Sequence, residues 1–271
     1  MELMTDFNNK YQTIILKKNG RGFSEIILNQ PKKHNALSPL MIEELNEVFD
    51  KLKEDQSTRF VILSANGKSF CAGGDLDWMR EQINSDRGTR IKEASKLAKI
   101  LYKMYNFSKP LIAKVEGNAF GGGIGIMSVC DIVIATENIK MALTETKLGL
   151  IPATISPYVI SKIGPNNSID LFTSARVFTS KEAKMMGLIK SYVKRNEIDD
   201  EIEKEVQSFY SNAPDAISAS KKLVRDLSVK INEDTIKFTI EALADVWENP
   251  EAIEGINAFF EKKKPSWIME N

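Results

Sequence analysis

Three consecutive glycines, Gly121 to Gly123, constrain the fold of this chain more than any other feature of its sequence. They follow the apolar run Leu111 to Val115, which predicts a buried strand, and precede the apolar segment Ile124 to Val129. Glycine costs about 1 kcal/mol against alanine in a helix, so a glycine run at a helix start needs a physical reason. One reason is close approach, because free N–H groups at a helix N-terminus can meet a ligand oxygen only where no side chain intervenes. A glycine-rich helix packed tightly against a neighbour is the alternative explanation.

The spacing of these glycines does not fit the common phosphate-binding loops. Ile126 stands where Gly-x-Gly-x-x-Gly needs its third glycine, and no Gly-Lys-Ser or Gly-Lys-Thr follows. No acidic residue closes a strand about twenty residues further on, as a dinucleotide-binding fold requires. A second stretch instead repeats the design of the first, because the apolar strand Phe60 to Ser64 is followed by a turn and by the pair Gly73-Gly74.

Composition excludes several classes of function. Lysine plus arginine equals aspartate plus glutamate at 37 each, so nothing indicates a nucleic-acid or membrane-surface protein, and an anionic ligand must be held locally. His34 is the only histidine, which excludes a multi-histidine metal site and leaves acid–base chemistry to carboxylates or a less common group. Cys71 and Cys130 lie in apolar contexts without metal-ligand spacing, so we expect reduced core thiols and no metal.

Length and the chain ends bear on architecture and compartment. A chain of 271 residues is long enough for one large α/β domain, or for a main domain with a helical appendage. The segment 1–10 is polar and contains acidic residues, unlike a signal or transit peptide. No apolar run approaches the roughly twenty residues that span a bilayer. We therefore expect a cytoplasmic protein without a membrane partner.

Periodicity predicts alternating strands and helices up to residue 197 and helices alone over 198–271. The expected strands are 11–16, 22–28, 60–64, 111–115, 132–135, 141–143 and 189–193. The expected helices are about 38–53, 91–105, a short one after the capping box Thr179-Ser180-Lys181-Glu182, 201–210, 216–226, 234–247 and 251–262. The polar, irregular segment 79–90 is expected to be mobile above a site. The chain thus divides into a core, 1–197, and a helical C-terminal region, 198–271, that caps the core or forms an oligomer interface.

The loop Thr144 to Ala153 carries one carboxylate, Glu145, in an otherwise apolar setting before Leu148-Gly149-Leu150-Ile151-Pro152. Two glycine-rich segments followed by a lone glutamate before Leu-Gly-x-x-Pro resemble the crotonase superfamily of enoyl-CoA hydratases and isomerases. The resemblance runs from about Pro31 to Lys263. It implies an α/β fold, a spiral of repeated β-β-α units whose helical C-terminal region trimerises, and hence a homotrimer or homohexamer.

The same resemblance implies roles for individual residues. The N–H groups of Gly74 and Gly122 form an oxyanion hole for a thioester oxygen, and Glu145 is the acid–base group. The expected contacts with coenzyme A, which is part of the substrate and not a separate cofactor, are Ala72, Asp75 and Leu76 near the adenine and Lys33 and Lys262 near the phosphates. Lys262 acts across a subunit boundary in this scheme, and solvated surface lysines are the alternative for both lysines.

One position departs from the family pattern. Hydratases of this family usually carry a second glutamate in the helix after the glycine run, and it falls on Gly125, which implies a site with one base. The segment Ala142 to Val159 looks closest to bacterial methylglutaconyl-CoA hydratases and the isohexenylglutaconyl-CoA hydratase-like enzymes that degrade isoprenoids. The resemblance therefore implies a branched 2-enoyl-CoA from leucine or acyclic terpene breakdown, with Gly125 leaving space for the acyl group or an ordered water.

Three functions remain open at this point. The first is hydration of a branched 2-enoyl-CoA, and the second is an enoyl-CoA isomerase, which needs only one base to move a proton between carbons. The third is an acyl-CoA-binding protein without turnover, against which Glu145 in an apolar loop argues. In both enzymes the chemistry passes through an enolate, which two preorganised N–H donors stabilise by several kcal/mol.

Overall fold

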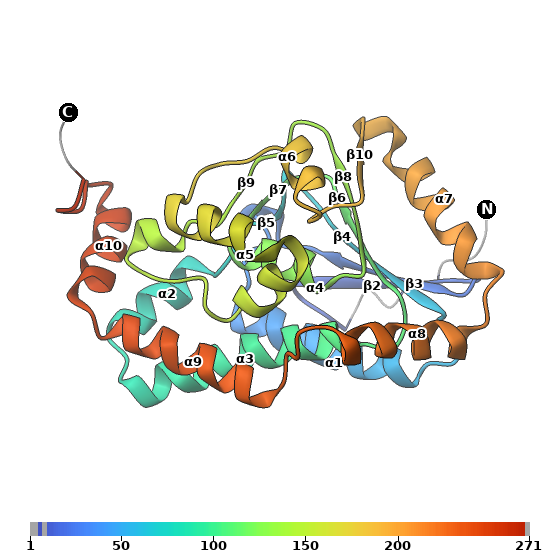
Figure 1. Cartoon of the computed structure of the whole chain (residues 1–271), viewed down its shortest axis with the longest axis horizontal. Coiled ribbons are helices and arrows are strands. Elements are labelled where there is room, and N and C mark those ends of the chain that lie inside the picture. The colour runs from blue at the N-terminus through green and yellow to red at the C-terminus, as the bar shows by residue number, and fades with distance from the viewer. Residues whose placement is uncertain (1–4, 7–9, 269–271) are drawn as a thin grey trace.

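A seven-stranded sheet runs through the centre of the protein, and a three-stranded sheet lies beside it (Figure 1). The computed structural model describes residues 5–6 and 10–268, so most of the segment 1–10 interpreted above lies outside the described residues. The large sheet has the order β1 (Thr5–Asp6), β2 (Ile14–Asn19), β3 (Phe23–Leu28), β4 (Phe60–Ala65), β6 (Leu111–Val115), β8 (Ile132–Thr136) and β10 (Ser191–Val193). The small sheet has the order β5 (Ser69–Cys71), β7 (Asn118–Phe120) and β9 (Met141–Ala142).

The helices follow the strands in a regular order. They are α1 (Pro39–Glu54), α2 (Leu76–Ile83), α3 (Arg87–Tyr105), α4 (Gly122–Val129), α5 (Ser156–Ser174), α6 (Ser180–Met185), α7 (Ile198–Tyr210), α8 (Pro214–Leu227), α9 (Glu233–Trp247) and α10 (Pro250–Glu261), with 3₁₀ turns η1 (Pro31–Lys33), η2 (Glu145–Leu148) and η3 (Arg195–Glu197). The units β4-β5-α2, β6-β7-α4 and β8-β9-α5 each place one strand in the large sheet and the next in the small sheet. This repetition confirms the predicted α/β spiral of β-β-α units.

Local sequence signals account for many of these boundaries. The Ser38 hydroxyl accepts a hydrogen bond from Met41 N, and Pro39 occupies the first position of α1. Thr179 and Glu182 form the predicted capping box at the start of α6.

The two cysteines, Cys71 and Cys130, are buried and form no disulfide, and burial raises the pKa of both thiols to about 12.

Contrary to expectation, the segment 79–90 is not irregular, and its mobility stays a prediction. Most of this segment lies in α2 and at the start of α3, where Asp86 caps the helix by accepting a hydrogen bond from Thr89 N. The buried Arg90 guanidinium donates to the carbonyl oxygens of Gln82 and Ile83 and pairs with Glu248 before α10. The polar residues therefore serve as caps and as a link between helices, which periodicity alone does not show.

The sequence also did not predict α5. This helix carries Pro157 at its start, and it is kinked where Gly164 has a φ of 77° and Pro165 follows. Glycine with positive φ and proline both interrupt a helical pattern, so the apolar periodicity on either side is too short to indicate one helix.

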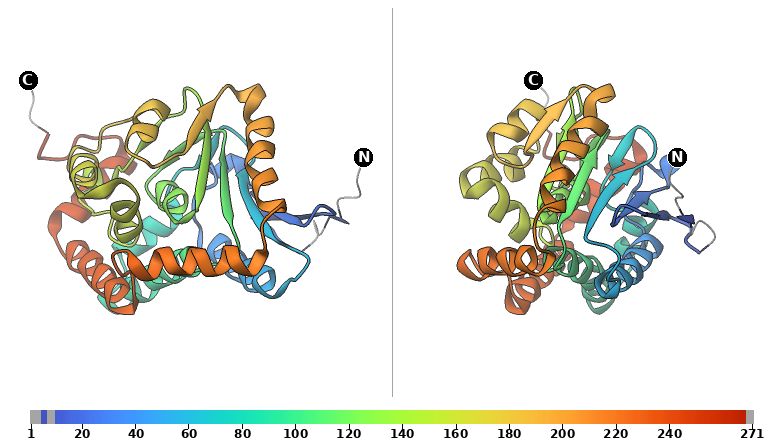
Figure 2. Two further views of the ribbon diagram at one scale, coloured as in Figure 1. Left: turned by 45° about the vertical axis from the view of Figure 1, so that its right-hand side comes forward. Right: turned by 90° about the vertical axis from the view of Figure 1, so that its right-hand side faces the viewer.

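The four helices of the C-terminal region lie differently on the core (Figures 1 and 2). The buried Ile198, Ile202 and Val206 of α7 join a cluster with residues of the large sheet. Helix α9 lies along α3, and α10 packs against η2 and α2. Helix α8 extends along one side of the molecule and has no buried residue. The division at residue 197 stays a prediction, and α7 begins at that point.

The contact between α10 and η2 depends on Gly255. A Cβ atom at this position would lie 2.5 Å from the carbonyl carbon of Leu148 and 2.9 Å from the Trp267 ring. Glycine to alanine usually stabilises a helix by about 1 kcal/mol, but we predict that Gly255→Ala lowers the free energy of unfolding by about 1–3 kcal/mol through overpacking. Urea denaturation measures the change. Gly88→Ala in α3 is the matched control, because its Cβ would meet only an ordinary 3.6 Å contact; equal effects would contradict the close-contact argument.

Candidate active site

The small parallel sheet brings three distant segments together at the carboxyl ends of its strands. Strand β5 pairs with β7 and β7 pairs with β9, all in parallel. Gly74 follows the end of β5 by three residues, Gly122 follows β7 by two, and Glu145 follows β9 by three. Ligands of open parallel sheets bind outside the carboxyl ends of the strands. The two predicted oxyanion glycines and the predicted acid–base residue therefore share one edge.

Gly73 and Gly74 lie beside the start of α4. A Cβ atom on Gly73 would lie 3.2 Å from the Phe120 carbonyl oxygen and 3.6 Å from Gly122 N. Gly73 has a φ of +96°, a conformation that glycine adopts without strain. Leu37 fixes the segment from the other side, since its N–H donates to Gly73 O (2.7 Å) and its carbonyl accepts from Asp75 N (3.2 Å).

Helix α4 begins at Gly122 immediately after a second glycine with positive φ. Gly121 has a φ of +46°, and its N–H donates to Ala142 O in β9 at 3.0 Å. In the described part of the chain, no group accepts a hydrogen bond from Gly74 N or Gly122 N. A side chain at 122 would collide with Leu37, whose Cδ1 would lie 2.8 Å from a Cβ. Two free N–H groups on adjacent segments, one of them at a helix N-terminus, form a site for developing negative charge.

The Glu145 carboxylate lies against this glycine pair. Its Oε1 would be 2.9 Å from a Cβ atom on Gly121, and its Oε2 is buried with no hydrogen-bond partner among the described residues. Burial raises the pKa of Glu145 from its ordinary value of 4.5 to about 7. A buried carboxyl group without a partner, which takes up and releases a proton near neutral pH, is suited to general acid–base chemistry.

The residues expected to contact coenzyme A include Asp75, which directly follows Gly74 at the same edge of the small sheet. Asp75 is buried and caps α2 by accepting hydrogen bonds from Asp77 N and Trp78 N. Lys33 Nζ lies 3.4 Å from Asp75 Oδ2 and 2.9 Å from Asp77 Oδ2, and its side chain is half exposed. These carboxylates raise the pKa of Lys33. Asp75 thus has a structural role in addition to the one expected of it.

The other expected contacts lie near α2 or on α10. Ala72 N donates to His34 O at 3.1 Å, and Leu76 is exposed at the start of α2. Lys262 is exposed and ends α10 in a left-handed conformation. Helix α10 reaches α2 of the same chain, where the Arg80 guanidinium lies 4.2 Å from the centre of the Phe260 ring. Contact of any of these residues with coenzyme A stays a prediction.

The free space expected beside Gly125 is filled by Ile155. A Cβ atom on Gly125 would collide with Ile155 Cγ2 and lie 2.9 Å from Ile155 Cβ. Ile155 is buried and immediately precedes α5. The glycine is therefore required by close packing between α4 and α5, and any effect of this position on the acyl group acts through Ile155.

Sequence reasoning missed four contributors to the site. Leu37 holds Gly73, the side chains of Trp78 and Met79 lie 4.0 Å from a Cβ position on Gly74, and Ile155 faces Gly125. The paired glycines were the available signal for positive φ: the first of each pair turns the backbone, and the second presents its N–H. Nothing local in the sequence marks the contacts of Leu37 and Ile155, because each joins segments far apart in the chain; Trp78 and Met79 reach Gly74 only because α2 begins two residues after it.

Comparison with known proteins agrees with this geometry. Residues 18–270 match the family model described as enoyl-CoA hydratase/isomerase. A methylglutaconyl-CoA hydratase from Homo sapiens mitochondria is 30% identical over 262 residues, covering 94% of this chain and 76% of that protein. A short-chain-enoyl-CoA hydratase of Clostridium acetobutylicum is 30% identical over 254 residues, covering 93% and 95%. The crystal structure of an enoyl-CoA hydratase from Shewanella pealeana superposes with a TM-score of 0.79 at 34% identity, covering 96% of this chain and 97% of that one.

The fold and the paired N–H groups define a protein of the crotonase superfamily. This chain belongs to the enoyl-CoA hydratase/isomerase family, with an acyl-CoA as the class of substrate that this family uses. None of the helices in the described ranges is both long enough and apolar enough to cross a membrane.

The raised pKa of Glu145 predicts a pH-dependent stability. Between pH 4.5 and about 7 the folded protein keeps a proton on Glu145 that the unfolded chain has released. Stability therefore falls as pH rises through this window, by about 3 kcal/mol at most from this group. Glu145→Gln removes the titration, so the variant gains stability relative to the parent between about pH 5 and about pH 8. Urea denaturation of both proteins at the two pH values measures the gain. A difference in the free energy of unfolding that is the same at both pH values would contradict a buried, unpaired carboxylate.

The packing of Gly125 on Ile155 is tested by a double-mutant cycle. We predict that Gly125→Ala lowers the free energy of unfolding by about 1–3 kcal/mol through overpacking. In the background of Ile155→Ala the same change costs less, because the Cγ2 methyl group is gone and only the close approach of the two Cβ atoms remains. Chemical denaturation of the four proteins gives the coupling energy. Additive effects would mean that the two residues do not touch.

Proposed function

We propose that this protein catalyses the reversible addition of water to a branched 2-enoyl-CoA of the 3-methylglutaconyl type, with Glu145 as the acid–base residue. The observation that carries the proposal is the buried, unpartnered Oε2 of Glu145 beside two free backbone N–H groups. The human relative named methylglutaconyl-CoA hydratase supports the acyl class. A reaction of this class occurs in leucine or acyclic terpene breakdown.

The geometry supports a sequence of two proton transfers through one carboxylate. The thioester oxygen accepts hydrogen bonds from Gly74 N and Gly122 N, which stabilise the enolate formed when water attacks the β-carbon. Glu145 takes the proton from that water and then delivers it to the α-carbon. The sum is one hydroxyl group on the β-carbon and one hydrogen on the α-carbon. A pKa of about 7 lets the same carboxyl group act as base and then as acid.

A branched substrate explains how one carboxylate suffices. Hydration of a β-branched enoyl group gives a tertiary alcohol, and the branch assists loss of hydroxide in the reverse direction. The family position for a second glutamate is Gly125, and Ile155 occupies the adjoining space. The second candidate is an enoyl-CoA isomerase, which the single carboxylate also favours, because moving a proton from one carbon to another needs one base. In both cases Lys33 and Lys262 bind phosphates and Ala72, Asp75 and Leu76 surround the adenine.

Replacement of the Glu145 carboxylate tests its role. Glutamine keeps the shape of glutamate but cannot accept a proton, so Glu145→Gln should lower kcat by about 10²–10⁴ with acyl-CoA binding nearly unchanged. Loss of enoyl absorbance measures kcat, and calorimetry measures binding. Glu137→Gln, which changes an exposed glutamate in the loop between β8 and β9, is the matched control. Activity of Glu145→Gln within about threefold of the parent, roughly 0.6 kcal/mol, would end the proposed role.

The choice of substrate separates the candidate functions. We expect a higher kcat/KM with 3-methylglutaconyl-CoA than with crotonyl-CoA, both followed by enoyl absorbance. Faster conversion of a 3-enoyl-CoA into its 2-enoyl isomer, without hydration, would favour the isomerase. Tight binding of all three esters without turnover would mean an acyl-CoA-binding protein.

We propose assembly into a homotrimer or homohexamer through the C-terminal helices. The outer face of α8 carries Leu223 and Leu227, which are 59% and 80% exposed, and Phe238 of α9 is 72% exposed. Large apolar side chains exposed on these helices support an interface in this region. Light scattering should give three or six times the 30.4 kDa mass of one chain, and Leu223→Asp with Leu227→Asp should shift it to one. A parent mass of one chain at micromolar concentration would contradict the proposal.

A further inference from the structure

A cavity of about 740 Å³ lies at the carboxyl end of α4, the end opposite the N–H of Gly122. Its walls come from the end of α3, the residues after α4, the first half of α5 and one face of α8. The charged residues that line it are Asp131, Lys162, Lys221 and Arg225, all in the described part of the chain. None of the residues placed in the active site above lines this cavity.

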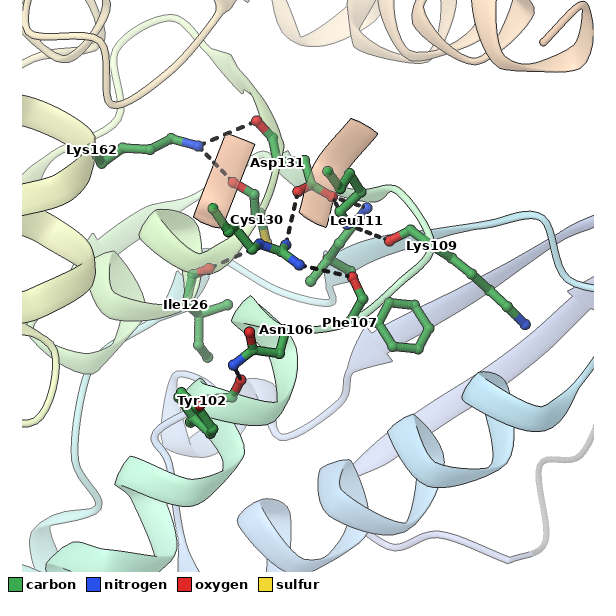
Figure 3. Close-up of polar contacts among 11 residues, drawn as sticks. Tyr102, Asn106, Phe107, Lys109, Leu111, Ile126, Cys130, Asp131 and Lys162 are labelled. Atoms are coloured by element: carbon green, nitrogen blue, oxygen red, sulfur yellow. Dashed lines mark hydrogen bonds and ion pairs between the residues drawn. The ribbon is translucent and has the colours of Figure 1, made fainter. Parts of the chain in front are cut away.

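The three cations of the cavity converge on one carboxylate and on backbone carbonyls. Lys162 Nζ donates to the carbonyl oxygens of Cys130 (2.6 Å) and Asp131 (3.3 Å), as Figure 3 shows. Lys221 donates to the Asp131 carboxylate and to Lys109 O (2.6 Å). Arg225 donates to Asp131 Oδ1 and to a carbonyl of the adjoining loop, both at 3.4 Å. The three side chains thus carry three positive charges around one negative charge.

The remaining positive charge is not balanced by the helix end. The carbonyls at the carboxyl end of a helix carry roughly half a negative charge, so more than one unit of positive charge is left over. The side chains of Lys221 and Arg225 are only 12% and 16% exposed, which limits neutralisation by water. Burial also lowers the pKa of Lys162 and of Lys221. Buried charges in proteins are normally paired, so this cluster lacks an anion.

Tyr158 belongs to the wall of the same cavity but lies beneath its surface. It is 1% exposed, and its hydroxyl oxygen is buried without a hydrogen-bond partner within the described residues. The Tyr105 ring packs against it with the ring centres 5.3 Å apart. The charged donors of the cavity are therefore those of the cationic cluster.

We propose that this cavity binds a small anion that carries phosphate or carboxylate groups. Lys162, Lys221 and Arg225 supply the charge and the hydrogen-bond donors. Such a ligand is distinct from the acyl-CoA of the catalytic site, whose phosphates are assigned to lysines elsewhere. The site therefore adds a second ligand to the proposed function and does not depend on it.

Binding of inorganic phosphate and of malonate to the intact protein tests the site without any assay of turnover. Each anion is titrated by calorimetry and by the shift in Tm, with chloride at equal ionic strength as the control. We expect saturable binding of at least one anion and a rise in Tm that chloride does not give. Lys162→Met should raise the Kd about tenfold or more, since one charge-assisted hydrogen bond is lost.

Two further variants keep the result interpretable. Tyr158→Phe removes only a buried, unpartnered hydroxyl, so it should leave the Tm without anion unchanged or higher and leave anion binding unchanged. Lys33→Met alters a lysine assigned to the coenzyme A phosphates, and anion binding to the cavity should survive it. Anion binding that Lys162→Met leaves unchanged, or that Lys33→Met abolishes, would overturn the proposal. The absence of anion binding to the parent protein would overturn it as well, and a change of oligomeric mass in Lys162→Met would then assign the cluster to an acidic side chain of a second copy.

Discussion

The close approach of two backbone segments, Gly73-Gly74 and Gly121-Gly122, is the constraint on which the rest of the structure depends. The pairing of β5 with β7 brings the segments together, and a Cβ atom on Gly73 would already approach the Phe120 carbonyl oxygen to 3.2 Å. Glycines with positive φ at 73 and 121 turn the chain, so that the next residue in each segment presents an unpaired N–H. Each N–H is costly to leave unpaired unless a ligand oxygen takes it. The fold thus holds a preorganised pair of donors.

The carboxylate of Glu145 completes this arrangement through packing. It follows β9, the third strand of the same sheet, and it lies against Gly121, where burial keeps its pKa near 7. Helix α10 packs on η2 through Gly255, so the C-terminal helices of this chain hold the turn that carries Glu145. Desolvation by the surrounding protein raises the pKa of the carboxyl group, so that it can take up and release a proton near neutral pH. Hydrogen bonds to the carboxylate would lower this pKa again.

The sequence predicted the parts of this site that local chemistry determines. Glycine pairs after apolar strands indicated the N–H groups, and a lone carboxylate in an apolar loop indicated Glu145. The capping residues and the four C-terminal helices were also predictable, because caps and 3.6-residue periodicity are local. The contact of Ile155 with Gly125 could not be predicted, since it joins residues thirty positions apart. For the same reason Arg90, which holds the segment 79–90 in place, appeared only as one more polar residue.

A structure with a bound acyl-CoA tests the central claim most directly, because it locates the thioester oxygen. The account predicts that this oxygen lies about 2.7–3.1 Å from both Gly74 N and Gly122 N, with a Glu145 carboxylate oxygen beside the α- and β-carbons of the acyl group. A thioester oxygen that meets only one of these N–H groups, or that lies away from both with Glu145 directed elsewhere, would contradict it.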